Sequence, residues 1–341
     1  MSEPTEDGIE IRTVDADDVP ALIALVRRCY GESYTEPEFY DPFALRAELV
    51  SHRLVSIGAV VGRRVVGHLG TRIPIPGDVV VDTVGGVVDP EYRGWGLTAR
   101  MGARMVEGYR ERGVVAAHHV ATGAHDRTQR LLVASGGVAT GALLGHVPAE
   151  TDYRGIEHGF GDSRIGVVVY VQTYGRLEPL DVYLPEGYAE TVLGLYGQLG
   201  LERRVRSVPD ADSASTDAAY GWIGSAVHDA PHGMSSFRFG RLAGGALRPA
   251  IELLDAARAT SQPVAYADVP IADPRSVELI EQLNHSGFFF GALLPGTDRS
   301  ETIRLQRLHG VPIAPHAIVT ASPQGQLLVD WITSQHKREA Q

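Results

Sequence analysis

The run that most constrains this chain leads from a strand through a proline and two glycines into a helix. Residues 79–88 are rich in valine, which favours a strand, and apolar residues recur every four positions between Leu97 and Arg112, which predicts a helix. Gly94 and Gly96 lie between the two and let the backbone approach a ligand without a Cβ in the way. The helix start adds unpaired N–H groups and the positive end of the helix dipole. The run therefore predicts a site for phosphate or pyrophosphate, although its spacing matches neither the dinucleotide-binding nor the P-loop glycine pattern.

The rest of the sequence alternates between strand and helix periodicities, which predicts an α/β fold with a mixed sheet. In residues 1–150 we expect strands at 9–14, 54–61, 65–73, 79–88, 114–120 and 143–148, with helices at 21–30, 44–49, 97–112 and 126–134. This order describes one three-layer α/β/α lobe. A polar, Gly-rich linker follows at 151–164. Residues 165–309 repeat the later order of these elements and predict a second such lobe, before a C-terminal tail at 310–341.

Composition and charge narrow the classes of function. The formal net charge of −11 disfavours nucleic-acid binding, which depends on clustered Lys and Arg. The longest apolar stretches fall well short of the roughly 18–20 residues that cross a bilayer, and the acidic N-terminus is unlike a secretory signal. Cys29 is the only cysteine, which excludes an intramolecular disulfide, and its apolar neighbours predict a small buried side chain. We therefore expect a cytoplasmic protein.

The glycine run resembles motif A of the GNAT superfamily of N-acetyltransferases. In that family the pattern V-x-P-x-x-R-G-x-G precedes the helix that binds the pyrophosphate of acetyl-CoA. Val88, Pro90, Arg93, Gly94 and Gly96 match this pattern in order and spacing. The final small residue of the family's shorter form is replaced by a threonine at position 98, whose hydroxyl at a helix start also suits phosphate.

The resemblance implies that acetyl-CoA or another acyl-CoA is the co-substrate. Backbone groups at the end of strand 79–88 would bond the pantetheine amides, and the glycine run would hold the pyrophosphate. These expected contacts are Val87, Val88, Arg93, Gly94, Trp95, Gly96, Leu97 and Thr98. Thr128 and Gln129, at the start of the next helix, are further candidates for touching pantetheine.

Acyl transfer to an amine needs a base for the ammonium, donors for the oxyanion and an acid for the departing thiolate. His118 and His119 are neighbours on a strand, so they point to opposite faces and one of them should face the cleft. Asp82 stands where many relatives carry an acidic residue that orders a water toward the amine. Each candidate base has a structural alternative, which is packing under a helix for the histidines and a solvated strand end for the aspartate. The family's usual tyrosine acid is replaced by Leu132.

Aromatic residues between the first two helices predict an acceptor pocket, with core packing beneath a broken helix as the alternative. They are Tyr30, Tyr34, Phe39 and Tyr40. No metal site is expected, because His228 and His232 lack acidic partners at metal-ligand spacing and no cysteine assists them.

The resemblance implies an acyl-CoA-dependent N-acyltransferase, most simply an N-acetyltransferase, that acts on the amine of a small metabolite or antibiotic-like acceptor. Because Leu132 replaces the acid, a non-catalytic acyl-CoA-binding or regulatory module is the alternative. An aminoacyl-tRNA-dependent transferase is a third reading, which the acidic balance and the CoA motif oppose. The expected partner is a small-molecule amine, with neither nucleic acid nor membrane, and a homodimer is left open.

The second lobe is expected to be a degenerate GNAT-like domain. Arg241–Ala246 formally fits R-x-x-G-x-A, yet no Val-x-Pro precedes it. Only the first lobe has the complete series of strand, proline, glycines and helix. The sequence therefore predicts one CoA per chain.

Overall fold

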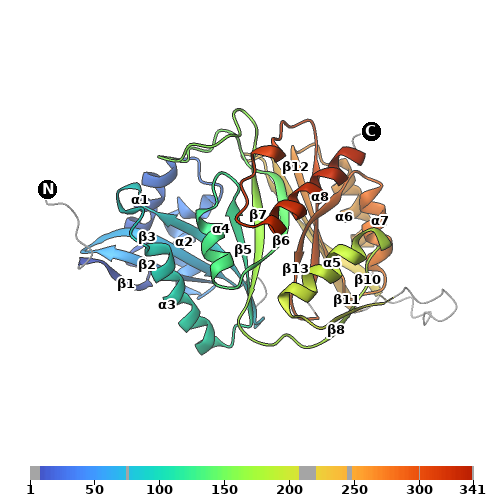
Figure 1. Cartoon of the computed structure of the whole chain (residues 1–341), viewed down its shortest axis with the longest axis horizontal. Helices are drawn as coiled ribbons and strands as arrows, with labels where there is room; N and C mark the ends of the chain where they lie inside the picture. The colour runs from blue at the N-terminus through green and yellow to red at the C-terminus, as the bar shows by residue number, and fades with distance from the viewer. Residues whose placement is uncertain (1–7, 74–76, 207–219, 244–247, 299, 340–341) are drawn as a thin grey trace. The chain divides into compact units, whose positions relative to one another are not determined.

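The computed structural model describes residues 8–73, 77–206, 220–243, 248–298 and 300–339 (Figure 1). The described chain is a mixed α/β protein, as its sequence periodicities predict. Contacts divide it into two compact units. The first comprises Met1–Val120, Ala149–Gly159 and Gln172–Gly175, and the second comprises Ala121–Pro148, Phe160–Val171 and Arg176–Gln341. Residues 121–148, which the sequence assigns to the first domain, thus group with the second unit, and the sequence-based boundaries and linker stay predictions.

The sheet of the first unit contains five strands in chain order. They are β1 (Glu10–Val14), β2 (Leu54–Val61), β3 (Arg64–Arg72), β4 (Val80–Val88) and β5 (Ala116–Thr122). The first four pair antiparallel, and β5 runs parallel to β4. Gly62 has a φ of +59° in the tight turn between β2 and β3, which a residue without a Cβ adopts without strain. The predicted hairpin at these strands is confirmed.

Helices cover both faces of this sheet (Figure 1). On one face, which we call the α1 face, lie α1 (Val19–Tyr30) and α2 (Pro42–Val50). On the other, the α3 face, lies α3 (Leu97–Arg112), whose Met101 and Met105 pack against the sheet. Burial of such side chains stabilises the fold by roughly 1.5–3 kcal/mol each. Cys29 belongs to the α1 core and burial raises the pKa of its thiol to about 11, so the expectation of a small buried side chain is confirmed.

Two irregularities in β4 separate it from its neighbours. The pairing with β3 shifts between His68 and Gly70, which leaves Gly85 in a bulge with a φ of +61°. The parallel ladder with β5 runs from Val80 to Asp82, opposite residues 116–118. Both strands continue beyond the last rung of this ladder. From residue 83 onward, β4 is therefore not paired with β5 as a regular central strand would be.

The second unit holds the remaining helices and strands of the described chain. In order they are α4 (Arg127–Ala134), β6 (Val138–Val147), β7 (Ile165–Thr173), β8 (Leu180–Val182), α5 (Glu186–Leu199), β9 (Arg203–Val205), β10 (Tyr220–Asp229), β11 (Met234–Ala243), α6 (Arg248–Ala259), β12 (Val264–Pro270), α7 (Ser276–Asn284), β13 (Phe289–Leu294), β14 (Thr302–Leu308) and α8 (Pro323–Glu339). The larger sheet has the strand order β7-β6-β13-β14-β12-β11-β10, and β8 pairs with β9. β6 begins five residues before the predicted start at 143. The prediction missed residues 138–142 because they are mostly small and carry little strand propensity. None of the described helices is long and apolar enough to cross a bilayer.

A buried ion pair anchors the core of the second unit. Arg203 donates from Nη2 to Glu301 over 2.8 Å, and neither side chain has any exposed surface. The hydroxyl of Tyr196 donates to the other carboxylate oxygen of Glu301 over 2.6 Å. Such a pair stabilises a fold only while both partners are present, since either charge left alone in the core is costly.

Candidate functional site

The start of α3 is open. Its N-cap is Gly96, in the left-handed region at a φ of +67°; no side chain caps the helix and its first turn has no acidic residue. Gly94 also has a positive φ, of +87°. A Cβ added to either glycine would meet nothing within 4 Å. The glycines are therefore required by their backbone conformation, and the space beside the loop suits an anion at the helix N-terminus.

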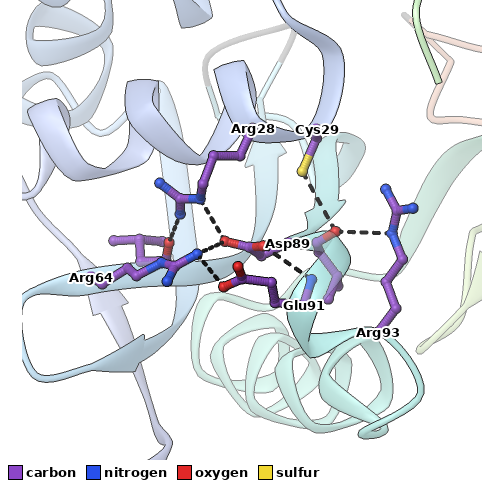
Figure 2. A network of polar contacts seen from close by, with 8 residues as sticks. Arg28, Cys29, Arg64, Asp89, Glu91 and Arg93 are labelled. Atoms are coloured by element: carbon purple, nitrogen blue, oxygen red, sulfur yellow. Dashed lines mark hydrogen bonds and ion pairs between the residues drawn. The ribbon is translucent and has the colours of Figure 1, made fainter. Parts of the chain in front are cut away.

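A buried carboxylate fixes the chain just before this loop (Figure 2). Asp89 is 1% exposed and accepts from Arg28 Nε at 2.5 Å and from Arg64 Nη2 at 2.8 Å. It also accepts from the backbone N–H of Glu91 at 3.2 Å, at the start of the short helix η3 (Pro90–Tyr92). Burial opposes its ionisation, but the hydrogen bonds from the two arginines outweigh burial and hold the pKa of Asp89 below its usual value. Sequence reasoning missed this network, whose only signal is an aspartate between a strand and a proline.

Arg93 ties the loop to the rest of the first unit. Its Nε donates to the carbonyl oxygen of Val88 at 3.3 Å, and its Nη1 donates to the carbonyl oxygen of Arg154 at 2.5 Å. The thiol of Cys29 donates to the same Val88 oxygen at 3.5 Å, as Figure 2 shows. The predicted pantetheine contact at Val88 thus meets a carbonyl that is already bonded. Part of the predicted phosphate-binding capacity of Arg93 is likewise used in holding the loop.

The other predicted CoA contacts divide into buried and accessible groups. Val87 and Leu97 bury their side chains in the α1 and α3 cores, so only their backbones are available. Trp95 is partly buried, with its ring centroid 5.8 Å from that of Tyr92. Thr98 is partly exposed in the first turn of α3. The loop therefore presents backbone N–H groups and one hydroxyl rather than a set of charged side chains.

Two candidate bases meet at the last rung between β4 and β5. His118 and Asp82 are paired in register, and the imidazole Nδ1 lies 3.1 Å from the Asp82 Oδ1. Their side chains are 12% and 38% exposed, and they lie on the α1 face, where Asp82 is also in register with Arg72. The carboxylate orients the imidazole. The sequence placed both residues near the cleft but did not pair them.

His119 projects to the opposite face, as strand alternation predicts. Its Nδ1 lies 2.6 Å from Thr83 Oγ1, and the Thr83 hydroxyl donates to the carbonyl oxygen of His118 at 2.7 Å. Thr83 is in register with Thr71, whose hydroxyl contacts α3 at Tyr109. Burial lowers the pKa of His119 to about 3, so the structure disfavours the predicted role of this residue as a base near neutral pH.

The aromatic segment between α1 and α2 is only partly available as a pocket. Phe39, in the short helix η2 (Pro37–Phe39), is fully buried in the α1 core. The Tyr40 hydroxyl accepts from the backbone N–H of Tyr34 at 2.9 Å and donates to the carbonyl of Gly31 at 3.0 Å. The ring of Tyr34 lies 4.8 Å from that of Tyr30, and both are partly exposed. For Phe39 and Tyr40 the alternative of internal packing thus describes the structure better.

An acidic group beside this segment was missed by sequence reasoning. Arg72 contacts the carboxylates of Glu38 at 2.6 Å and Glu36 at 3.4 Å. Glu36 also accepts from the Tyr34 hydroxyl at 3.1 Å, and the backbone amide of Gly85 faces its carboxylate. Burial raises the pKa of Glu36 despite Arg72. The residues come from a loop and two strands, so no sequence window holds them together.

His68 holds the bulge of β4 from inside the sheet. It is fully buried, and its Nδ1 donates to the carbonyl oxygen of Gly85 over 2.7 Å, while its Nε2 accepts from Ser56 Oγ over 2.9 Å. A Cβ on Gly85 would lie 2.6 Å from the ring of Phe39. Burial lowers the pKa of His68 to about 4, so it stays neutral in this clamp.

Thr128 and Gln129 lie on α4 in the second unit. The Gln129 side chain is fully buried; its Nε2 donates to the carbonyl oxygens of Thr122 and Val319, and its Oε1 accepts from Tyr170. The predicted pantetheine contact therefore finds the Gln129 amide already used, whereas Thr128 is exposed. In the described ranges, no three His, Cys, Asp or Glu side chains gather as metal ligands.

Comparisons with known proteins identify one region of the chain. Residues 10–125, about a third of it, match the family model of the acetyltransferase (GNAT) domain. No curated protein sequence matches.

Several solved acetyltransferases resemble about half of the chain at low identity. An N-acetyltransferase from Staphylococcus aureus has 12% identity and a TM-score of 0.39, covering 48% of this chain and 98% of its own. The PaiA N-acetyltransferase from Thermoplasma acidophilum, in complex with coenzyme A, has 15% and 0.35, covering 49% and 99%. A phosphinothricin acetyltransferase from Sinorhizobium meliloti, in complex with AcCoA, has 17% and 0.39, covering 49% and 89%.

Proposed function

Because residues 10–125 match the GNAT acetyltransferase domain, we propose that the chain is an acyl-CoA-dependent N-acyltransferase. It transfers an acyl group, most simply acetyl, from CoA to the amine of a small metabolite or antibiotic-like acceptor. The observation that carries this proposal is the open start of α3, where Gly94 and Gly96 leave room beside uncapped N–H groups. A diphosphate suits this helix start, and it is also the anion that the family binds at the corresponding loop.

The Asp82–His118 pair supplies the base. An amine is mostly protonated at neutral pH and must lose its proton before it attacks the thioester carbonyl. His118 takes that proton while Asp82 holds the ring and stabilises the imidazolium. The new C–N bond forms as the C–S bond to CoA breaks. The pair lies at the point where the β4–β5 ladder ends, on the face that also carries the Tyr30 and Tyr34 rings.

The thiolate leaves without a tyrosine to protonate it. Leu132, at the position of the family's usual acid, is a buried side chain of α4 and has no proton to give. A CoA thiol resembles cysteine, whose pKa is roughly 8.5, so its thiolate is a tolerable leaving group. The rate is therefore governed by deprotonation of the amine and rises from neutral to mildly alkaline pH.

The α1 face favours an acceptor that carries positive charge. Glu36, Glu38 and Asp82 come from this face, and Arg72 offsets only part of their charge. A small amine with a second cationic group fits this balance better than an acidic acceptor does.

A non-catalytic acyl-CoA-binding module is the second candidate, favoured by Leu132 in place of the acid and by the internal bonds of Tyr40. One experiment separates the two. Acetyl-CoA is titrated calorimetrically into the full chain, and thiol release is then followed over a panel of mono- and diamines. Binding with turnover of at least one amine supports the transferase, and binding without turnover of any amine favours the module. Absence of acetyl-CoA binding contradicts both.

A further inference from the structure

The hydrogen bonds of Thr83 fix the tautomer of His119. A threonine hydroxyl has one hydrogen, and that of Thr83 is directed at the carbonyl oxygen of His118. The contact of 2.6 Å to His119 Nδ1 must then be donated by the imidazole, so Nδ1 carries the proton. The opposite nitrogen, Nε2, is left with a lone pair and can act only as an acceptor.

That acceptor has no partner. The Nε2 atom of His119 is buried and meets no hydrogen-bond donor among the residues that the structure describes. A buried polar atom without a partner is costly, and such atoms in folded proteins mark a bound water, a ligand or a functional role. The two nitrogens of this one ring thus differ sharply, one held at short distance and the other unused.

His119 is suited to accept a hydrogen bond rather than a proton. Burial is the main reason that its pKa falls to about 3; the neighbouring His118 lowers it further, and Asp82 opposes this. The ring therefore stays neutral. It also lies on the α3 face, whereas the Asp82–His118 pair lies on the α1 face. His119 thus lies on the opposite face of the sheet from the pair that we propose as the base for the amine.

The position along β4 points to the part of the ligand that would be bound. Thr83 lies five residues before Val88, and a strand rises about 3.3 Å per residue, so the two are roughly 16 Å apart along β4. A diphosphate at the loop after Val88 does not reach that far. An extended arm that runs from the diphosphate along β4 does, and the arm of CoA carries amide N–H donors.

We propose that His119 binds the pantetheine arm of CoA by accepting an amide N–H at Nε2, with Thr83 as the positioning residue that sets the tautomer. The proposal rests on the proposed function, since it requires CoA to bind at the start of α3. It reassigns His119 from the base to the recognition of the acyl donor.

The test compares two probes that differ by this arm, CoA and the nucleotide 3′-phosphoadenosine 5′-diphosphate. Their affinities are measured calorimetrically for the wild-type chain and for His119→Leu, His119→Gln and Thr83→Val. His119→Leu is expected to weaken CoA binding roughly tenfold, the value of one hydrogen bond lost in a buried site, and to leave the affinity for the nucleotide probe unchanged. His119→Gln keeps an acceptor oxygen and should stay within about threefold of wild type. Thr83→Val releases the tautomer and should weaken CoA in the same direction as the leucine variant.

Three results overturn the inference. The first is equal CoA affinity for His119→Leu and wild type, which indicates that a water or nothing serves Nε2. The second is an equal loss of affinity for CoA and the nucleotide probe, which shows that His119 does not act on the arm. The third is an ¹⁵N imidazole spectrum of the free protein with the proton on Nε2. If the wild type binds neither probe, the proposed function itself fails, which is distinct from all three.

Discussion

The two units each contain a parallel strand followed by a helix, but the helix starts differ. In the first unit β4 leads into α3, which begins at Gly96 with no side-chain cap and no acid in its first turn. In the second unit β12 leads into α7, whose N-cap residue Arg275 has no side-chain cap either, but a carboxylate lies just before that helix. Asp273 accepts from the backbone N–H of Arg275 at 3.0 Å and holds the same residue's guanidinium at 2.9 and 2.7 Å. Glu278 adds a further acid to the first turn of α7.

This difference shows why a helix N-terminus alone does not make an anion site. Every helix has unpaired N–H groups and a positive dipole end at its start. In α7 the chain's own Asp273 places a negative charge beside the helix start and bonds the backbone N–H of the N-cap residue Arg275. In α3 the nearby carboxylate, Asp89, is instead turned toward Arg28 and Arg64, which leaves the helix start free.

The largest effect is expected on turnover. Asp82→Asn should lower kcat for acyl transfer roughly a thousandfold, because the base loses its orienting charge, while the affinity for acetyl-CoA stays unchanged. The second unit offers a matched pair, since His232 Nδ1 lies 2.7 Å from Asp229 Oδ2. Asp229→Asn should leave kcat at the wild-type value. Steady-state thiol release with a diamine measures both, and equal rates for wild type and Asp82→Asn would exclude this pair as the base.

A second large effect concerns binding. Gly96→Glu should weaken CoA roughly a hundredfold, because it puts a side chain on a left-handed residue and a negative charge at the helix start. Gly113 is the matched control at the other end of α3, with a φ of +69° and equally open space. Gly113→Glu should bind CoA like wild type. Calorimetry measures the CoA affinity of both variants. Comparable losses of affinity in both would show that the loop is not part of the CoA site.

The next prediction concerns the free energy of unfolding, to which Asp89 near α3 and Asp273 near α7 both contribute. The folded-state pKa of Asp89 is lowered, so its ionised form stabilises the fold above the unfolded pKa of roughly 3.9, and this stabilisation is lost as the pH falls through the folded pKa. Asp89→Asn should therefore lose about 3 kcal/mol at pH 7 and less at pH 3, which lies below the unfolded pKa. Urea unfolding at both pH values measures this.

The corresponding change in α7 serves as the control for Asp89. Asp273→Asn should also destabilise the fold, yet leave the CoA affinity intact, because its helix start is not a ligand site. A loss of CoA affinity in Asp273→Asn with a normal fold would contradict the contrast between the two helices.

The smallest effect is expected on stoichiometry, which should remain at one CoA per chain even when Asp273→Ala frees the start of α7. Equilibrium titration with CoA measures the ratio in both proteins. Two equivalent sites would point to the run Arg241–Ala246, of which residues 244–246 lie outside the described part of the chain.

Much of the first unit was predictable because its signals are local. The helix at 97–112 and the strand at 54–61 have the predicted bounds, since each is written in a regular apolar period. The glycine loop was found because its motif is also contained in one short stretch of sequence. By contrast, β14 and α8 in the second unit were not predicted. α8 lies in the tail that the sequence left without structure, and its apolar positions become meaningful only against the strands they cover.

The mixed α/β class, the strand–glycine–helix run and the residues with the chemistry for a base follow from local sequence patterns. Which of those residues meet depends on how distant segments fold together. Asp82 and His118 are thirty-six positions apart and become a pair only through the β4–β5 register, whereas His119 is held by Thr83 on the opposite face. The sequence contains the periodicity that places a side chain on one face of a helix or strand. The strand register and the depth of burial, which set hydrogen bonds and pKa values, arise only when distant segments pack together.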